Sequence, residues 1–195
     1  LHYIDTHKPI ADGELVWVDA GCEWGLYASD ITRTYPINGK FSAEQRAVYD
    51  VVLEAHNKAC EAIQIGANCT DPQKASELSL SQGLKDLGLL TQSMDEIMDK
   101  QLFREFYYHT IGHWLGLDVH DDCPYSIGEK EVTFQKNMVM TIEPGIYVNQ
   151  TANVDDKWKG IGIRIENDIL ATDTGYENLT SLVPSNADEI EGLMQ

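Results

Sequence analysis

Four acidic residues of this sequence stand inside apolar, strand-like segments. They are Asp19 in LVWVDAG, Asp30 in YASDITRT, Glu143 in TIEPGIY and Glu166 in GIRIENDI, and His113 in HTIGHWLGLDVH adds an imidazole. A buried carboxylate carries a large desolvation penalty, so four such acids require a counter-charge. Two divalent cations would balance the four negative charges. The five residues therefore predict a site for two metal ions.

The types of these side chains indicate which metals and which reaction to expect. A ligand set made mostly of carboxylates prefers harder ions than a thiolate site does, so we expect Mn²⁺, with Co²⁺, Zn²⁺ and Fe²⁺ left open. Two such ions ~3.5–4 Å apart can hold a bridging hydroxide and polarise a carbonyl group. The expected reaction class is metal-assisted hydrolysis.

Histidines cluster around the proposed imidazole ligand. His109, His113 and His120 are three of the six histidines of the chain and fall within twelve residues. Their spacing does not match the His-Glu-x-x-His helix of single-zinc proteases. Three histidines together favour a site, whereas His56 stands in an amphipathic helical pattern and is expected to be structural.

Two strands, over 15–21 and 27–35, must position the first two acids. If Trp24 and Gly25 form a two-residue turn, Asp19 faces Asp30 across the hairpin. Directly opposed Cβ atoms lie ~5 Å apart on the same face of a sheet. Two acids so placed repel each other unless a cation lies between them.

Helices and further strands follow in the remaining sequence. Ser42 and Gln45 form a capping-box pattern that begins a helix extending to Gly66. Further helices are expected from Asp71-Pro72 to about Gly88, over 93–103, and as a turn at 189–195; strands are expected around 106–112, 138–148, 160–171 and 177–180. This order predicts an α+β fold with helices on one face of a mostly antiparallel sheet, in one domain.

Composition excludes several classes of protein. The chain has 195 residues and a formal net charge of −18, which argues against binding to a phosphate backbone. It contains no apolar run of ~18 residues, so no transmembrane helix or membrane partner is expected. Its four cysteines lack CxxC spacing and are predicted to be free thiols of a reducing compartment.

Five motifs together identify a family resemblance. VDAG, SDITRT, HxxGHxLGLDVHD, MTIEPGIY and GIGIRIEND resemble, in this order, the motifs of the Xaa-Pro aminopeptidase (aminopeptidase P) and prolidase family of pita-bread dinuclear metallopeptidases. The resemblance runs from Leu1 to the end of the chain. It implies the pita-bread form of the α+β fold, the same five metal ligands, and hydrolysis of the Xaa-Pro bond at the N-terminus of peptides with proline in second position.

The same resemblance implies roles for individual side chains. Glu143 would take a proton from the water that bridges the metals, in addition to binding metal. His120 would hydrogen-bond the scissile carbonyl group. His2 and His109 would line the substrate pocket, and Arg164 would support the strand that carries the last ligand.

Two other functions remain alternatives. Prolidases split only the dipeptide and place an arginine within the segment 155–160, where this sequence has only Lys157 and Lys159. A non-catalytic binding module of the same fold would be expected to lose ligands, and all five are present here.

Members of the resembled family carry an N-terminal domain and an opening catalytic segment before the first motif. We therefore expect residues 1–195 to be an incomplete metallopeptidase catalytic domain that is weakly active or inactive alone. A cytoplasmic location is expected, with the mitochondrion as the alternative, and a homo-oligomer is left open.

Overall fold

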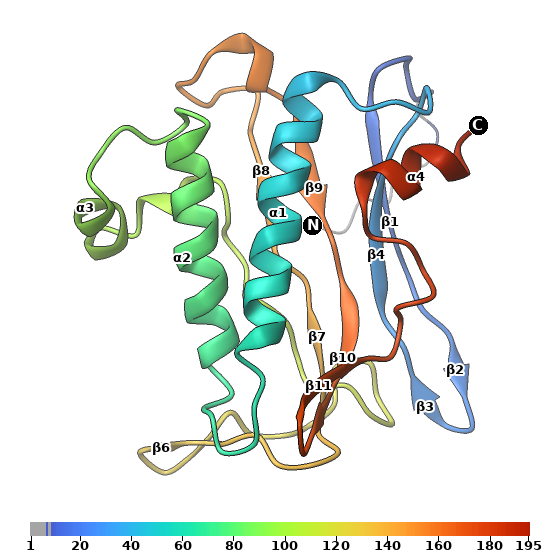
Figure 1. The fold of residues 1–195 in the computed structure, drawn as a ribbon, viewed down its shortest axis with the longest axis vertical. Coiled ribbons are helices and arrows are strands. Elements are labelled where there is room, and N and C mark those ends of the chain that lie inside the picture. The colour runs from blue at the N-terminus through green and yellow to red at the C-terminus, as the bar shows by residue number, and fades with distance from the viewer. Residues whose placement is uncertain (1–6, 8) are drawn as a thin grey trace.

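Antiparallel strands and two long helices make up the computed structural model, which describes residue 7 and residues 9–195 (Figure 1). The strands are β1 (Leu15–Ala20), β2 (Glu23–Trp24), β3 (Tyr27–Ala28), β4 (Ile31–Pro36), β5 (Ser126–Ile127), β6 (Lys130–Glu131), β7 (Val139–Ile142), β8 (Gly145–Tyr147), β9 (Gly162–Arg164), β10 (Asn167–Thr172) and β11 (Gly175–Asn178). The helices are α1 (Ala43–Glu61), α2 (Asp71–Asp86), α3 (Met94–Asp99) and α4 (Ala187–Leu193), with 3₁₀ turns η1 (Leu102–Glu105) and η2 (Asp156–Trp158). The α+β prediction is confirmed.

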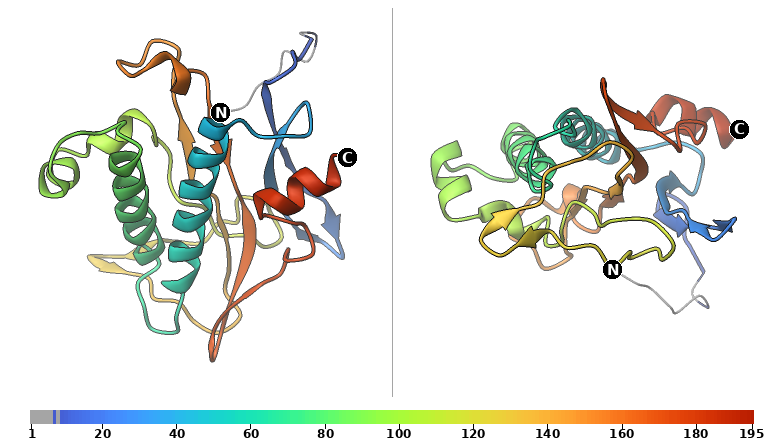
Figure 2. Two further views of the ribbon diagram at one scale, coloured as in Figure 1. Left: turned by 45° about the horizontal axis from the view of Figure 1, so that its top comes forward. Right: turned by 90° about the horizontal axis from the view of Figure 1, so that it is seen from below.

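Helices α1 and α2 lie side by side, and α1 packs against the strands β7, β8 and β9 (Figures 1 and 2). The capping box of α1 is confirmed, because Ser42 accepts from the Gln45 amide and the Gln45 side chain accepts from the Ser42 amide. The two helices approach closely at Gly83, where an added Cβ would lie 2.2 Å from a methyl group of Val51. The predicted packing of helices on one face of the strands is therefore present.

The first hairpin has a different register from the expected one. β1 pairs with β4 so that Asp19 faces Thr32, and the two-residue turn is Gly25-Leu26, both with positive φ. Positive φ at both central residues is the geometry of a type I′ turn. Asp30 lies in the interruption between β3 and β4, two residues from the position opposite Asp19. A two-residue offset preserves the face of a strand, so both acids still point to one side.

Two expected elements are wrong. The helix over 93–103 is broken at Gln101, whose φ of 51° is left-handed, so α3 and η1 are separate. The segment 106–112 is not a strand, because the amides of Phe106 and Tyr107 both donate to the Phe103 carbonyl and complete the preceding turn.

The chain instead runs alongside β7 a few residues later. The amides of Thr141 and Glu143 donate to the carbonyls of His113 and Ile111, over 2.9 and 2.7 Å. This approach requires a glycine between those two acceptors, since a Cβ on Gly112 would lie 1.9 Å from the Thr141 carbonyl oxygen. His113 is thus held beside the end of β7, directly next to Glu143.

Strand β4 joins the hairpin to the rest of the sheet. The Thr34 hydroxyl donates to the Arg164 carbonyl over 2.9 Å and accepts from the Arg164 amide over 3.1 Å. The Glu166 amide donates to the Thr32 carbonyl over 3.1 Å. These bonds place the acids of the first hairpin beside the acid of the last strands, although 130 or more residues separate them in sequence.

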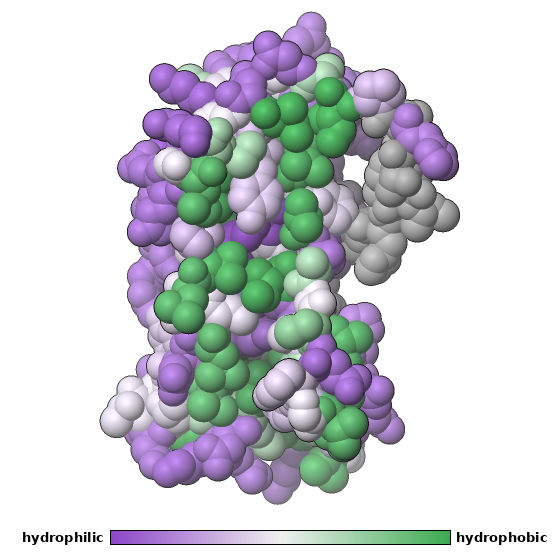
Figure 3. All heavy atoms as spheres, turned by 90° about the vertical axis from the view of Figure 1, so that its right-hand side faces the viewer, coloured by the Kyte–Doolittle hydropathy of each residue, from purple (hydrophilic) through white to green (hydrophobic). Residues whose placement is uncertain are grey.

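The outer side of the hairpin is exposed among the described residues. Val18, Trp24 and Leu26 are 47%, 87% and 69% exposed. Figure 3 faces the side of the molecule that carries β1 to β4 and shows apolar area gathered there. Asp19 lies on the same strand as Val18 and is also exposed, so the expectation that all four acids are buried is wrong for Asp19.

No helix among residues 7 and 9–195 combines the length and the apolar character that a membrane crossing requires.

Candidate metal centre

Three of the predicted ligands converge. Asp30, His113 and Glu166 each offer a ligand atom, and these atoms lie within 4.8 Å of one another. Nε2 of His113 lies 3.5 Å from a carboxylate oxygen of Asp30 and 3.8 Å from one of Glu143. The other ring nitrogen, Nδ1, lies 3.1 Å from the Trp114 carbonyl oxygen and donates to it. In the neutral ring Nε2 then carries the lone pair on the side of the carboxylates, as metal binding requires.

Asp19, the fifth predicted ligand, reaches the same cluster from β1. Its carboxylate forms an ion pair with the Arg164 guanidinium and hydrogen-bonds to the Asp30 carboxyl group. Arg164 itself is 3% exposed and lies over the ring of Trp17, 4.4 Å from its centroid. The predicted site arginine thus binds a proposed ligand directly.

The electrostatics of the cluster indicate a missing positive charge. Burial raises the pKa of Glu166 to about 9, and the charges of Glu143 and Asp30 act in the same direction. Burial also raises the pKa of Glu143 to about 7, although Arg164 and His113 oppose the shift. Without a bound cation Glu166 therefore favours the neutral form at neutral pH, and Glu143 is about half protonated. A group of oxygen donors that resists ionisation in this way fits divalent ions.

The pKa values of Asp30 and His113 are shifted in opposite directions, as in an ion pair. Burial acts to raise the pKa of Asp30, but hydrogen bonds with His113 and Asp19 lower it overall. Burial acts to lower the pKa of His113, but the hydrogen bond with Asp30 raises it overall. The contact between the two side chains therefore favours the charged form of each.

Glu166 is positioned by a residue that sequence reasoning missed. The Thr32 hydroxyl donates to a Glu166 oxygen over 2.6 Å and accepts from Nε of Arg164 over 3.1 Å. A threonine in a strand carries no local signal of such a role. Its place opposite Asp19 in the true register is what brings it to the cluster.

A buried arginine and histidine support the same segment from behind. Arg33 donates to the carbonyls of Thr32 and Glu166 and to the side chain of Asn167. Nε2 of His56 accepts from the Asn167 amide group over 2.9 Å. His56 is 3% exposed, as expected for a structural histidine of α1.

Asp168 is a second residue that sequence reasoning missed. Both of its carboxylate oxygens lie 3.3 Å from the backbone nitrogen of Asp30. Burial raises its pKa to about 6, against the hydrogen bond from the Asp30 backbone. The alternation in GIRIEND that separates Arg164 and Glu166 from the isoleucines continues to Asp168, and that was the available signal.

The two predicted substrate-site histidines next to the cluster are both described. The rings of His120 and His113 contact each other edge to face, with centroids 4.2 Å apart, and His120 is exposed. Nδ1 of His109 donates to the Thr110 carbonyl and Nε2 accepts from the Tyr147 hydroxyl, over 2.8 and 2.9 Å. Burial lowers the pKa of His109 to about 4, so it is neutral. His2 lies outside the described residues.

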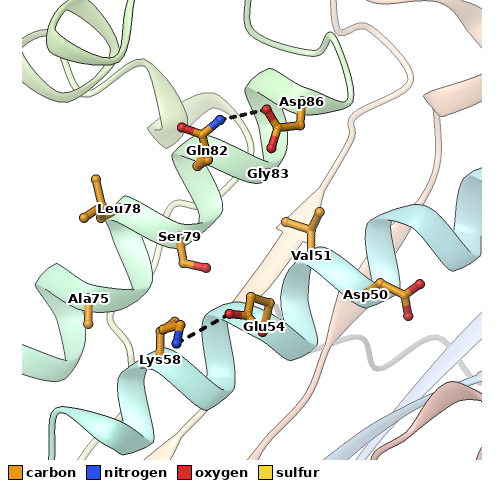
Figure 4. A pocket seen from close by; sticks show the side chains of 10 residues that line it. All are labelled: Asp50, Val51, Glu54, Lys58, Ala75, Leu78, Ser79, Gln82, Gly83 and Asp86. Carbon is orange, nitrogen blue, oxygen red and sulfur yellow. Dashed lines mark hydrogen bonds and ion pairs between the residues drawn. The ribbon is translucent and has the colours of Figure 1, made fainter.

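A cavity elsewhere in the molecule contains none of the predicted site residues. It has a volume of about 750 Å³ and lies between α1 and α2, where Val51, Leu78 and Gly83 are among its lining residues (Figure 4). Its charged residues are already bound within the helices, as in the Lys58–Glu54 pair at 3.7 Å. This cavity therefore adds no metal ligands to the carboxylate cluster.

This fold and this cluster are those of a metallopeptidase, and the chain belongs to metallopeptidase family M24, whose model matches residues 1–173. The chain is 45% identical to a Xaa-Pro aminopeptidase of Haemophilus influenzae and 43% identical to one of Escherichia coli. Both alignments cover all of this chain, but only 45% and 44% of the respective relative.

Solved structures show the same likeness. The aminopeptidase PepP of Pseudomonas aeruginosa superposes with a TM-score of 0.97 at 46% identity, over all of this chain and 44% of that one. Aminopeptidase P II of Yersinia pestis gives a TM-score of 0.95 at 44% identity, again over 44% of its chain. The pita-bread fold is thereby confirmed. The chain spans less than half the length of these relatives.

Proposed function

We propose that this chain carries the metal centre of a Xaa-Pro aminopeptidase, which hydrolyses the first peptide bond of peptides with proline in second position. The convergence of Asp30, His113 and Glu166 within 4.8 Å carries the proposal. Asp19 and Glu143 complete the proposed ligand set of two divalent ions. The similarity to relatives named Xaa-Pro aminopeptidase over the whole chain supports the choice of substrate.

The residues of the chain divide the chemistry among them. Divalent ions held by these ligands would polarise the scissile carbonyl group and increase the acidity of water. Glu143 accepts a proton from the attacking water and returns it to the departing proline nitrogen. His120 donates a hydrogen bond to the carbonyl oxygen as negative charge develops there. Arg164 holds Asp19, while His109 lines the substrate pocket together with His2.

The metal, the assembly and the location are further parts of the proposal. Carboxylate oxygens with one imidazole suit Mn²⁺ among the divalent ions. The four cysteines are free thiols in the structure, which suits the reducing cytoplasm. A homo-oligomer is the proposed assembly, and its size can be measured by light scattering of the purified chain.

Peptide hydrolysis tests the function. The chain is incubated with Mn²⁺ and either Arg-Pro-Pro or Ala-Pro, and the products are identified by mass spectrometry. Release of arginine from the tripeptide, with slower cleavage of the dipeptide, is expected. Preferential cleavage of Ala-Pro would indicate a prolidase instead.

A matched variant separates catalysis from binding. His120→Ala should lower kcat and leave the metal content unchanged, because His120 is proposed to contact the substrate and no metal. We also propose that the 195 residues turn over more slowly than a full-length relative. Equal turnover by this chain and the Haemophilus influenzae relative, measured side by side, would contradict that part.

A further inference from the structure

Asp168 contacts the metal cluster through the backbone of a proposed ligand. Its two carboxylate oxygens each lie 3.3 Å from the Asp30 backbone nitrogen. The Asp30 peptide lies in the interruption between β3 and β4, where the strand ladder is broken. The carboxylate therefore serves as the acceptor that a neighbouring strand would otherwise supply.

The Asp168 carboxylate is held firmly in place. The residue is 3% exposed and pairs with Thr141 of β7 in the antiparallel ladder. Its own amide donates to the Thr180 hydroxyl over 3.2 Å, and its carbonyl accepts from the Leu179 amide over 3.0 Å. A side chain on so constrained a backbone can fix the position of the peptide that it binds.

Each converging ligand is oriented by a partner outside the cluster. Thr32 binds Glu166, and the Trp114 carbonyl binds the ring of His113. For Asp30 the corresponding contact is the hydrogen bond from its own amide to Asp168. The direction of this amide sets the direction of the Cα–Cβ bond, and so the approach of the Asp30 carboxylate to His113 at 3.5 Å.

We propose that Asp168 is a positioning residue of the metal centre, which increases the affinity for divalent ions by holding the Asp30 peptide. The inference rests on the proposed metal centre and goes beyond its five ligands. Loss of an outer partner of a metal ligand typically costs 10–100-fold in metal affinity. We expect a loss of about this size, on the order of 10–100-fold, when Asp168 is truncated.

Two substitutions and two measurements test the proposal. Asp168→Ala removes the acceptor, whereas Asp168→Asn retains one acceptor oxygen and removes the charge. The affinity of the full chain for Mn²⁺ is measured by calorimetry, and hydrogen exchange of the Asp30 amide is measured by NMR in metal-free protein. D168A should bind Mn²⁺ more weakly and exchange the Asp30 amide faster. D168N should recover most of the affinity and protection.

Controls separate positioning from general stability. Asp173→Ala removes an acid from the exposed turn after β10, where it pairs with Lys136, and should bind Mn²⁺ like the unmodified chain. Urea unfolding of every metal-free variant shows how much fold stability each has lost. Should D168A not fold, Asp168→Ser replaces it as a shorter side chain in the same test.

Two results would overturn the proposal. One is a D168A variant that keeps native Mn²⁺ affinity. The other is equal loss in D168A and D168N, which would assign the effect to charge and not to the hydrogen bond. Because Mn²⁺ binding is read separately from hydrolysis, a chain whose affinity depends on Asp168 but which cleaves no peptide would retain this inference and reject the proposed function.

Discussion

The hydroxyl group of Thr32 stands between Arg164 and Glu166, donating to the acid over 2.6 Å and accepting from the guanidinium over 3.1 Å. A hydroxyl group has one proton to donate. Because the oxygen of Thr32 accepts from Arg164 on one side, its proton points to Glu166 on the other. The arginine therefore orients Glu166 without forming a direct ion pair with it. Its own ion pair is with Asp19. Glu166 is the most buried acid of the cluster, and a bound cation would stabilise its charged form.

Asp30→Asn should abolish metal binding at the site that Asp30 forms with His113 and Glu166. The substitution preserves shape and removes one anionic ligand, so we expect a loss of metal affinity beyond the roughly 10–100-fold seen for outer partners. Elemental analysis of protein purified without chelator, expressed as metal per chain, provides the measurement. Asp173→Asn is the matched control on the exposed surface. Full metal occupancy in D30N would exclude Asp30 as a ligand.

Bound metal should stabilise the fold strongly. Four acids that repel one another in the metal-free chain become ligands, and ions that bind only the folded state shift unfolding by mass action. At a free concentration of 100 times the dissociation constant, each site should add about 2.7 kcal/mol to the free energy of unfolding. Urea titrations with Mn²⁺ and with EDTA measure the difference. Coincident curves would contradict the prediction.

We expect buried His56 to make the free energy of unfolding sensitive to acid. Burial, together with the positive charge of Arg33, lowers its pKa to about 4, from an ordinary 6.5. Between pH 6.5 and 4 the unfolded chain binds a proton at His56 and the folded chain does not. The contribution of neutral His56 to the free energy of unfolding is therefore complete above pH 6.5 and is lost as the pH decreases toward 4. The loss amounts to about 3 kcal/mol at the lower end of this range.

Urea unfolding of metal-free protein at several pH values between 4 and 7 measures this loss. The groups that contact the ring include the Asn167 amide and the Cys60 thiol, the latter 3.8 Å from Nδ1. Neither carries a charge in this range, so His56→Gln should remove the His56 contribution to the slope. An unchanged slope in H56Q would assign the acid sensitivity to other groups.

Gly112→Ala should destabilise the chain severely. An added Cβ would lie 1.9 Å from the Thr141 carbonyl oxygen, and the backbone on both sides is held by the hydrogen bonds along β7. We expect a loss of about 3 kcal/mol or more, at the upper end of overpacking effects. Gly192→Ala in α4 is the control, because nothing lies within 4 Å of its added Cβ. Similar unfolding midpoints for the two variants would contradict the steric argument.

The parts of the fold that local pattern determines could be predicted from sequence. The capping box at Ser42 and the apolar periodicity of α1 and α2 are local features and were found correctly. The hairpin register was not, because the turn uses Leu26 at positive φ, which L-residues rarely adopt. The expected turn placed Gly25 at the second central position, whereas the structure places it at the first.

The candidate site shows the same division. Four carboxylates in apolar strands are visible in the sequence because each is locally out of place. The contacts of Thr32 and Asp168 are not visible, since their partners Glu166 and Asp30 are 134 and 138 residues away. Which backbone amide a carboxylate will meet is decided only when the strands assemble.

The order of the proposed ligands along the chain also sets when the centre can form during biosynthesis. Asp30 leaves the ribosome well before Glu166, and at ~5–20 residues per second the interval is roughly 7 to 27 seconds. During that time the nascent chain presents Asp19 and Asp30 first, and His113 and Glu143 join them before Glu166 is added. The complete proposed ligand set therefore exists only once Glu166 has been synthesised.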